Sequence, residues 1–283
     1  MKFITAIFNG LHGSKFGGRL NRDRHYTYSI RTLANLGHPM VCYIATDDMP
    51  FVQEYLAKHE VTNIEFREYD LESFEYHKKI QEIKEINKAV YAEDNVWEYR
   101  SVELMWLKLF WLKQEADTMA DMDKVFWIDA GLSHGGIMPK KYNESPLDEY
   151  EQSFRNIKAF NPKLASKLDN LTQESLFTFY CNNRQHHYPP LYSHDNVMSG
   201  SVVAGLFGGR VSDVKTLFEK GKEIIDYIVT EDTLLQEELI LTLVHQHNPG
   251  LFRAFDFDTW YHEDWNCFDP SMKSFSAFFE GLA

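Results

Sequence analysis

FITAIFN occupies residues 3–9 and, together with MVCYIATDD at residues 40–48, decides the fold. Both runs are apolar and rich in β-branched or aromatic residues, which predicts two buried strands. Residues 24–36 between them predict a helix that ends at Gly37. A strand, a helix and a strand in succession imply that the two strands pair in parallel.

The alternation of helices and strands continues along the chain. A helix is expected at 50–60, a strand at 63–69 and a charged helix at 73–93. A helix at 98–119 is apolar on most faces, and the strand that follows it, at 123–131, ends on one carboxylate. The sequence therefore predicts an α/β fold in which helices flank a mixed, mostly parallel central sheet.

The chain changes character at 137–196, which is polar, aromatic and proline-bearing. We interpret this segment as an insertion on the acceptor side of a site. Regular structure is expected again at 199–210, followed by a helix to about residue 229, a helix at 232–250 and a strand-like end at 251–265. Because no linker, repeat or low-complexity tract interrupts it, residues 1–283 are expected to form a single domain.

Composition limits the classes of protein that fit. The 283 residues are 44% hydrophobic, yet no apolar run approaches the roughly 20 residues that span a bilayer. Three well-separated cysteines (Cys42, Cys181 and Cys267) favour a reducing cytoplasm over a disulfide framework. A formal net charge of -13 argues against broad attraction to nucleic acid, although a local basic groove stays open.

Carboxylates follow two of the expected strands. Asp129 ends the strand at 123–131, and in open α/β sheets ligands collect outside the carboxyl ends of strands. Asp47 and Asp48 end the second strand in the same sense. These residues could bind a ligand at one sheet edge. Alternatively, Asp129 could cap the end of its strand, and Asp47 and Asp48 could cap the next helix.

Candidate phosphate ligands lie in two places. The loop after the first strand, NGLHGSKFGGRLNRDR, contains Asn9, several glycines and Arg19, which suit a diphosphate, although it could also be an ordinary surface loop. It matches neither the P-loop nor the GxGxxG pattern. Lys108 lies among tryptophans and leucines, where it must extend to water, pair with an anion or contact phosphate.

Three further groups could contribute to a site. Gly208 and Gly209 end the small-residue run at 200–210, which fits close backbone approach to a ligand or tight internal packing. Glu237 and Glu238 lie in an apolar helix, where a partly buried carboxylate can act as a base or can face water. The cluster DFDTWYHEDW, residues 256–265, could bind a metal or form a solvated acidic turn.

With these residues in hand, the chain resembles the HtrL/YibB-like family of bacterial and phage proteins, which is related to glycosyltransferases of the GT-A fold. The resemblance covers most of the chain except its middle, and the stretches that carry it are ITAIFNG, WLKLFWLKQEA, KVFWIDAG, SVVAGLFGG, DTLLQEELILTLVHQHNPGLF and DTWYH. It implies a single GT-A-like, Rossmann-like domain.

The resemblance also implies roles for individual residues. WIDAG resembles the Asp-x-Asp motif with Asp129 in first position, but Gly131 in second position departs from it. Asp258 or His262 could then complete a manganese or magnesium site with Asp129. The remaining implied roles are nucleoside contact by the first strand and Asp47, phosphate contact by Lys108, donor-sugar contact by Gly208 and Gly209, and a place near the reacting centre for Glu237 or Glu238.

The expected activity is transfer of a sugar from a nucleoside diphosphate sugar, with a UDP-sugar favoured, to an acceptor hydroxyl. The acceptor is either a glycan such as lipopolysaccharide or a hydroxymethylated base of phage DNA. Arg184, His186, His187, Lys140 and Lys141 could line a groove for DNA. A noncatalytic protein that binds nucleotide sugars or glycans and has a degenerate metal site is the alternative.

Overall fold

The computed structural model describes residues 1–8, 22–87, 102–130, 161–186 and 198–256. It confirms the α/β class: seven strands form one mixed sheet in the order β3-β2-β1-β4-β6-β5-β7, with helices along it. The described residues divide into two compact units. The first comprises the described residues of 1–69 and 128–171, and the second those of 70–127 and 172–256.

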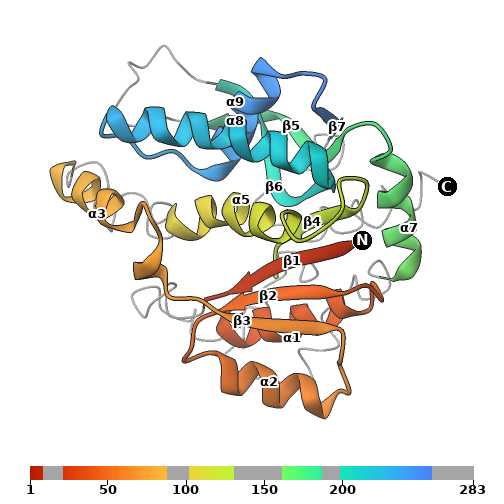
Figure 1. Cartoon of the computed structure of the whole chain (residues 1–283). Helices are drawn as coiled ribbons and strands as arrows, with labels where there is room; N and C mark the ends of the chain where they lie inside the picture. Colours follow the sequence, from red (N-terminus) through yellow and green to blue (C-terminus); the bar gives the residue numbers. More distant parts are fainter. Residues whose placement is uncertain (9–21, 88–101, 131–160, 187–197, 257–283) are drawn as a thin grey trace. The chain divides into compact units, whose positions relative to one another are not determined.

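The first unit contains the parallel strands that the opening sequence predicts (Figure 1). Its elements are β1 (Lys2–Ile7), α1 (Arg22–Ala34), β2 (Met40–Ile44), α2 (Met49–Lys58), β3 (Ile64–Glu68) and α7 (Pro162–Leu171). Strands β1 and β2 pair in parallel, as do β2 and β3. After α1 the chain turns through Gly37, whose φ of 73° is one that glycine adopts at little cost.

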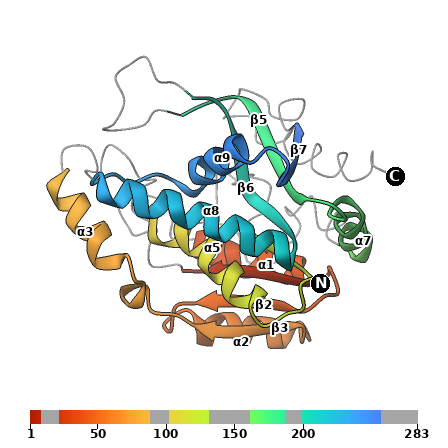
Figure 2. The same ribbon diagram turned by 45° about the horizontal axis from the view of Figure 1, so that its top comes forward.

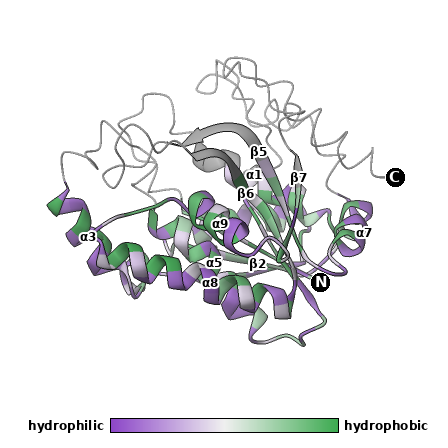
Figure 3. Cartoon of the chain, turned by 90° about the horizontal axis from the view of Figure 1, so that it is seen from above, coloured by the Kyte–Doolittle hydropathy of each residue, from purple (hydrophilic) through white to green (hydrophobic). Residues whose placement is uncertain are grey.

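The second unit is built around two helices and an antiparallel strand pair. Its elements are η3 (Leu71–Ser73), α3 (His77–Ile86), α5 (Val102–Ala116), β4 (Lys124–Ile128), β5 (Leu176–His186), β6 (Met198–Arg210), α8 (Val211–Thr230), α9 (Glu237–His247) and β7 (Phe252–Asp256). The last residue of β4, Ile128, belongs to the first unit. Helices α5 and α8 run beside each other, and α9 packs on β6 (Figure 2). Hydrophilic and hydrophobic residues recur along α3 and α8, as expected of helices with one buried face (Figure 3).

Two elements lie inside 137–196, the segment interpreted as an insertion. Helix α7 begins where the Asn161 side chain accepts a hydrogen bond from the Lys163 backbone N–H at 2.8 Å, with Pro162 as the first helical residue. This Asn-Pro start is a readable helix signal. Strand β5 pairs with both β6 and β7, so residues 176–186 belong to the sheet.

Helix α9 starts later than the sequence suggests. The pattern predicts a helix over 232–250, but Asp232 has a φ of 49° and the residues just before Glu237 are not helical. Leu234 and Leu235 are buried there, and the Leu235 carbonyl accepts a 2.7 Å hydrogen bond from the buried Trp106 Nε1. Tertiary contacts of an apolar segment thus delay the helix.

His245, in the last turn of α9, packs against aromatic rings of β5 and β7. Its ring centroid lies 5.6 Å from that of Tyr180 and 5.8 Å from that of Phe252. Burial lowers the pKa of His245, because a charged imidazole is disfavoured away from water.

This lowered pKa makes stability depend on pH. Between the ordinary histidine pKa, about 6.5, and the lower folded-state value, the unfolded chain binds more protons than the folded one. We therefore expect the His245 contribution to be fully present above that ordinary value and to be lost as pH falls through the folded pKa. Urea unfolding at a series of pH values should give a shallower acid-side loss for His245→Phe than for wild type. The exposed His247→Phe is the control, and equal slopes in both variants would contradict the expectation.

Candidate functional site

The carboxyl ends of β1 and β2 lie side by side in the first unit. Ile7 is in register with Ile44, and the Ala45 N–H donates to the Ile7 carbonyl at 3.3 Å. The chain that continues beyond β1, which carries Asn9 and Arg19, therefore leaves the sheet beside the chain that continues beyond β2. Asn9 and Arg19 themselves lie outside the described residues.

Asp47 and Asp48 occupy this edge. Asp47 is exposed, and Asp48 is half-buried at the N-cap position of α2, where its side chain makes no capping hydrogen bond. Next to them, the Thr46 hydroxyl donates to Glu68 at the end of β3 over 3.1 Å. The edge thus presents carboxylates at the ends of two parallel strands, which is where α/β sheets bind ligands.

Cys42 lies in the middle of β2 and is fully buried. Burial raises the pKa of its thiol, and the negative charge of Asp48 raises it further. A thiol held in the protonated form is a poor nucleophile. Cys42 therefore acts as an apolar core residue.

Asp129 directly follows β4 and is half-buried, as its place at a strand end predicts. Gly131, Asp258 and His262 lie outside the described residues. Among the residues that are described, no group of three histidine, cysteine, aspartate or glutamate side chains could hold a metal ion. The metal site of Asp129, Asp258 and His262 therefore stays a prediction.

Lys108 and Glu237 form a buried ion pair in the second unit. Lys108 Nζ lies 2.7 Å from Glu237 Oε1, and the two side chains are only 12% and 8% exposed. Lys108 Nζ also lies 5.5 Å from the centroid of the Trp127 ring, within the range of a cation–π contact. Of the alternatives open for Lys108, the structure gives pairing with an anion, and that anion is Glu237.

Glu238 has a different environment from its neighbour. It is half-buried, and its Oε1 accepts a hydrogen bond from the Ala204 N–H on β6 at 3.4 Å. The carboxylate therefore contacts the backbone of β6, and the residue as a whole is partly exposed. Glu237 and Glu238 thus have different environments, since Glu237 pairs with Lys108 and Glu238 contacts the backbone of β6.

Thr242, one turn further along α9, ties the helix to the same strand. Its Oγ1 accepts from the Val202 N–H at 2.9 Å and donates to the Glu238 carbonyl at 2.5 Å. Sequence reasoning did not identify Thr242, since a threonine in an apolar helix carries no distinctive signal. Its hydroxyl helps to hold the start of α9, and with it Glu238, against β6.

Thr242 and Thr5 allow the same substitution to be compared in two settings. Thr242→Val leaves the buried Val202 N–H without its acceptor, which should destabilise the protein by about 1–3 kcal/mol. The Thr5 hydroxyl is fully buried and has no hydrogen-bond partner among the described residues. Thr5→Val should therefore stabilise the protein by about 1 kcal/mol. Urea unfolding of both variants checks the pair, and shifts of the same sign would contradict it.

Gly208 and Gly209 lie where β6 passes the start of β4. A Cβ on Gly208, whose φ is 147°, would lie 2.3 Å from the Val125 carbonyl oxygen. At Gly209 a Cβ would lie 3.1 Å from the Leu176 side chain. Internal packing is therefore sufficient to explain glycine at 208, and contact of either residue with a donor sugar stays a prediction.

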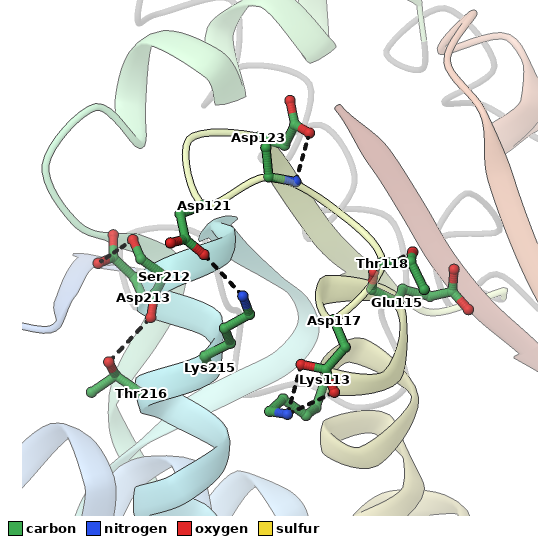
Figure 4. A network of polar contacts seen from close by, with 11 residues as sticks. Lys113, Glu115, Asp117, Thr118, Asp121, Asp123, Ser212, Asp213, Lys215 and Thr216 are labelled. Carbon is green, nitrogen blue, oxygen red and sulfur yellow. Dashed lines mark hydrogen bonds and ion pairs between the residues drawn. The ribbon is translucent and has the colours of Figure 1, made fainter.

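Polar contacts surround this same end of β4 (Figure 4). The Val211 N–H donates to the Asp123 carbonyl at 2.9 Å, and Lys215 Nζ contacts Asp121 at 2.9 Å. With Gly208 beside Val125, these contacts show that β6 runs antiparallel to β4. Ala204, whose N–H contacts Glu238, lies four residues before Gly208 on β6. Because β6 and β4 are antiparallel, Glu238 lies toward the carboxyl end of β4.

None of the described helices is long and apolar enough to cross a membrane. No protein-family model and no curated protein matches the chain.

The chain is distantly similar to many solved structures, including the following two. The chain is similar to a 4-diphosphocytidyl-2C-methyl-D-erythritol synthase from Anaerococcus prevotii, with 8% identity, a TM-score of 0.43 and coverage of 99% of this chain and 95% of that chain. It is also similar to a structure assigned as a glucose-1-phosphate thymidylyltransferase from Bacillus anthracis in complex with sucrose, with 10% identity, a TM-score of 0.44 and coverage of 90% and 86%. Likenesses at this level carry no conclusion about what this chain binds or which reaction it performs.

Proposed function

We propose that this protein is a glycosyltransferase that moves a sugar from a nucleoside diphosphate sugar, with a UDP-sugar favoured, to an acceptor hydroxyl. The observation that carries the proposal is the difference in environment between two adjacent glutamates, Glu237 and Glu238. Glu237 is buried and neutralised by Lys108, whereas Glu238 is half-buried against β6. This arrangement places the Glu238 carboxylate beside β6 and fixes its position through its neighbour, and a partly buried carboxylate can serve as a base.

The proposed reaction assigns Glu238 the acceptor's proton. As the acceptor O–H gives this proton to Glu238, the oxygen forms a bond to the anomeric carbon of the donor. The bond between that carbon and the diphosphate oxygen breaks, and the diphosphate leaves with the electron pair. Glu237 would act as a positioning residue, because its bond to Lys108 holds the first turn of α9 on α5.

Nucleotide binding is proposed for the edge of the first unit. There the ends of parallel strands β1 and β2 lie together and carry Asp47 and Asp48. Asn9, Arg19, Asp129 and Gly131 are proposed to contribute there, and a divalent cation held by Asp129, Asp258 and His262 would neutralise the leaving diphosphate. The resemblance to the HtrL/YibB-like family and its GT-A relatives supports this assignment. The proposed acceptors are a glycan, which we favour, or a modified DNA base.

A donor screen tests the proposal. Purified protein is incubated with UDP-, GDP-, CMP- and dTDP-sugars, with and without manganese, and both thermal stabilisation and donor hydrolysis are measured. We expect one donor to raise the melting temperature and to be hydrolysed slowly, and we expect Asp129→Asn to lose both effects. Stabilisation without hydrolysis or transfer would favour the noncatalytic binding protein, and no effect of any donor would refute nucleotide-sugar binding.

A further inference from the structure

The turn between α8 and α9 contains a residue in an uncommon conformation. Asp232 has a φ of 49°, in the left-handed region that favours glycine. Its N–H donates to the Val229 carbonyl at 3.3 Å, and the Thr233 N–H donates to the Ile228 carbonyl at 2.9 Å. These two bonds form the Schellman motif, whose left-handed position is usually occupied by glycine. An aspartate is less favourable there for the backbone, which indicates a use for its side chain.

Helix α3 contacts both the carboxylate and the carbonyl of Asp232. Lys79 Nζ lies 2.8 Å from Asp232 Oδ1, and Asn87 Nδ2 donates to the Asp232 carbonyl at 3.0 Å. Helix α3 is itself tied to α5, because Gln81 Nε2 donates to the buried Glu103 carboxylate at 2.6 Å. Through these contacts α3 connects α5 with the end of α8 (Figure 1).

The segment between Asp232 and α9 is buried. Residues 233–236 are each at most 7% exposed, and Trp106 Nε1 of α5 donates to the Leu235 carbonyl at 2.7 Å. Close-packed side chains do not shift independently of their neighbours. A displacement of Asp232 therefore passes along this segment to the first turn of α9, which carries Glu238.

The two ends of the segment are held by different helices. Helix α5 holds the end next to α9, through Trp106 and through the pair of Lys108 with Glu237. Helix α3 holds the end next to α8, through a pair whose Lys79 and Asp232 side chains are 38% and 48% exposed. A pair this exposed can change a conformational equilibrium by at most about fivefold. The contact with α3 is thus the weaker and more adjustable of the two.

We propose that Asp232 is a positioning residue for Glu238. Its contacts with Lys79 and Asn87 make the position of the proposed base depend on the docking of α3. This inference rests on the proposed function and adds a residue to its machinery.

Kinetics with the donor found in the screen test the proposal. Asp232→Gly keeps the left-handed turn and removes the carboxylate. We expect it to lower kcat for donor hydrolysis by about fivefold, to leave the donor KM unchanged and to keep the melting temperature within about 3 °C of wild type. Asp232→Asn tolerates the same φ and can still accept from Lys79, so it should recover most of the wild-type kcat.

A double-variant comparison isolates the contact with α3. Lys79→Met should lower kcat by the same factor as Asp232→Gly. The two substitutions combined should be no slower than either alone, because both remove one contact. Losses that multiply in the combined variant would overturn the proposal.

Glu60 provides a matched control in the first unit. It is exposed, has a φ of 55° and follows α2 in the same kind of turn. Glu60→Gly therefore makes the same change to the backbone away from α3, and it should keep wild-type kinetics. The positioning role is overturned if Asp232→Gly has the same kcat as Glu60→Gly, or if Asp232→Gly melts far below wild type.

Hydrogen exchange separates failure of this inference from failure of the proposed function. Mass spectrometry follows the amides of a peptide that covers residues 237–244. Their exchange should be about fivefold faster in Asp232→Gly and Lys79→Met than in wild type and Glu60→Gly. If wild type hydrolyses no donor while exchange differs in this way, the proposed function fails and the contact of α3 still positions α9. Exchange equal to wild type in both variants overturns the positioning itself.

Discussion

Replacing Lys108 by methionine is expected to lower the free energy of unfolding by about 3–5 kcal/mol. Methionine keeps most of the aliphatic volume, but it leaves the Glu237 carboxylate, 8% exposed, without its counter-ion. The free-energy penalty of an unpaired buried carboxylate is far larger than the net stabilisation by the ion pair. The carboxylate has lost its hydrating water and no longer has a counter-ion to replace it.

The comparison needs two further variants. Lys108→Met combined with Glu237→Leu removes both charges and should recover most of the lost stability. Lys113→Met, on the same helix, breaks a pair with Asp117 whose side chains are 22% and 50% exposed, and should cost no more than about 1 kcal/mol. Urea unfolding followed by circular dichroism is the appropriate measurement, since Lys108 lies over Trp127 and would alter tryptophan fluorescence.

A small cost for Lys108→Met, similar to that for Lys113→Met, would mean that water reaches Glu237. A double variant no more stable than the single one would mean that packing of the lysine, and not its charge, is what matters there.

Glu238→Gln is expected to reduce sugar transfer and donor hydrolysis by about 10²–10⁴-fold, the usual contribution of a general base. The amide keeps an oxygen that can accept from the Ala204 N–H, so the position of α9 and the donor KM should change little. It cannot take up the acceptor's proton, and the loss should therefore fall on kcat.

Initial rates with the donor found in the screen check this expectation. Glu219→Gln, the same change at an exposed position of α8, is the matched control and should keep wild-type kinetics. Activity of Glu238→Gln within tenfold of wild type would remove Glu238 from the role of base. If the Glu238→Gln variant also had a much lower melting temperature, enough to explain its lost activity, the carboxylate would be structural.

The sequence predicts most of the secondary structure because its signals are local. The apolar run at 3–9 appears as β1 and the run at 40–48 as β2, and the two pair in parallel as predicted. Strand β2 ends earlier than its apolar run, because the chain turns at Ala45 and α2 begins at Met49. The elements α7 and β5 were missed because the polar and aromatic residues around them obscure a clear Asn-Pro helix start and a strand with buried Phe177 and Phe179.

For the candidate site, too, some features follow from the local sequence and others only from the tertiary structure. From the sequence alone one can state that Lys108, in an apolar helix, needs a special environment, and that Glu237 and Glu238 are candidate acids or bases. Helical periodicity does not decide which glutamate faces inward. Only tertiary structure supplies that answer, because Lys108 and Glu237 are 129 residues apart and meet through the packing of α5 against α9.

What the sequence by itself determined is the order and type of the strands and helices that it marks with apolar periodicity, glycine and proline. These signals act over a few residues and need no partner. What only the tertiary structure decided is which polar group meets which: Glu237 with Lys108, Glu238 with β6, and Gly208 with the backbone of β4. Burial removes water from these groups, so each one must find a partner or a fitting space that lies far away along the chain.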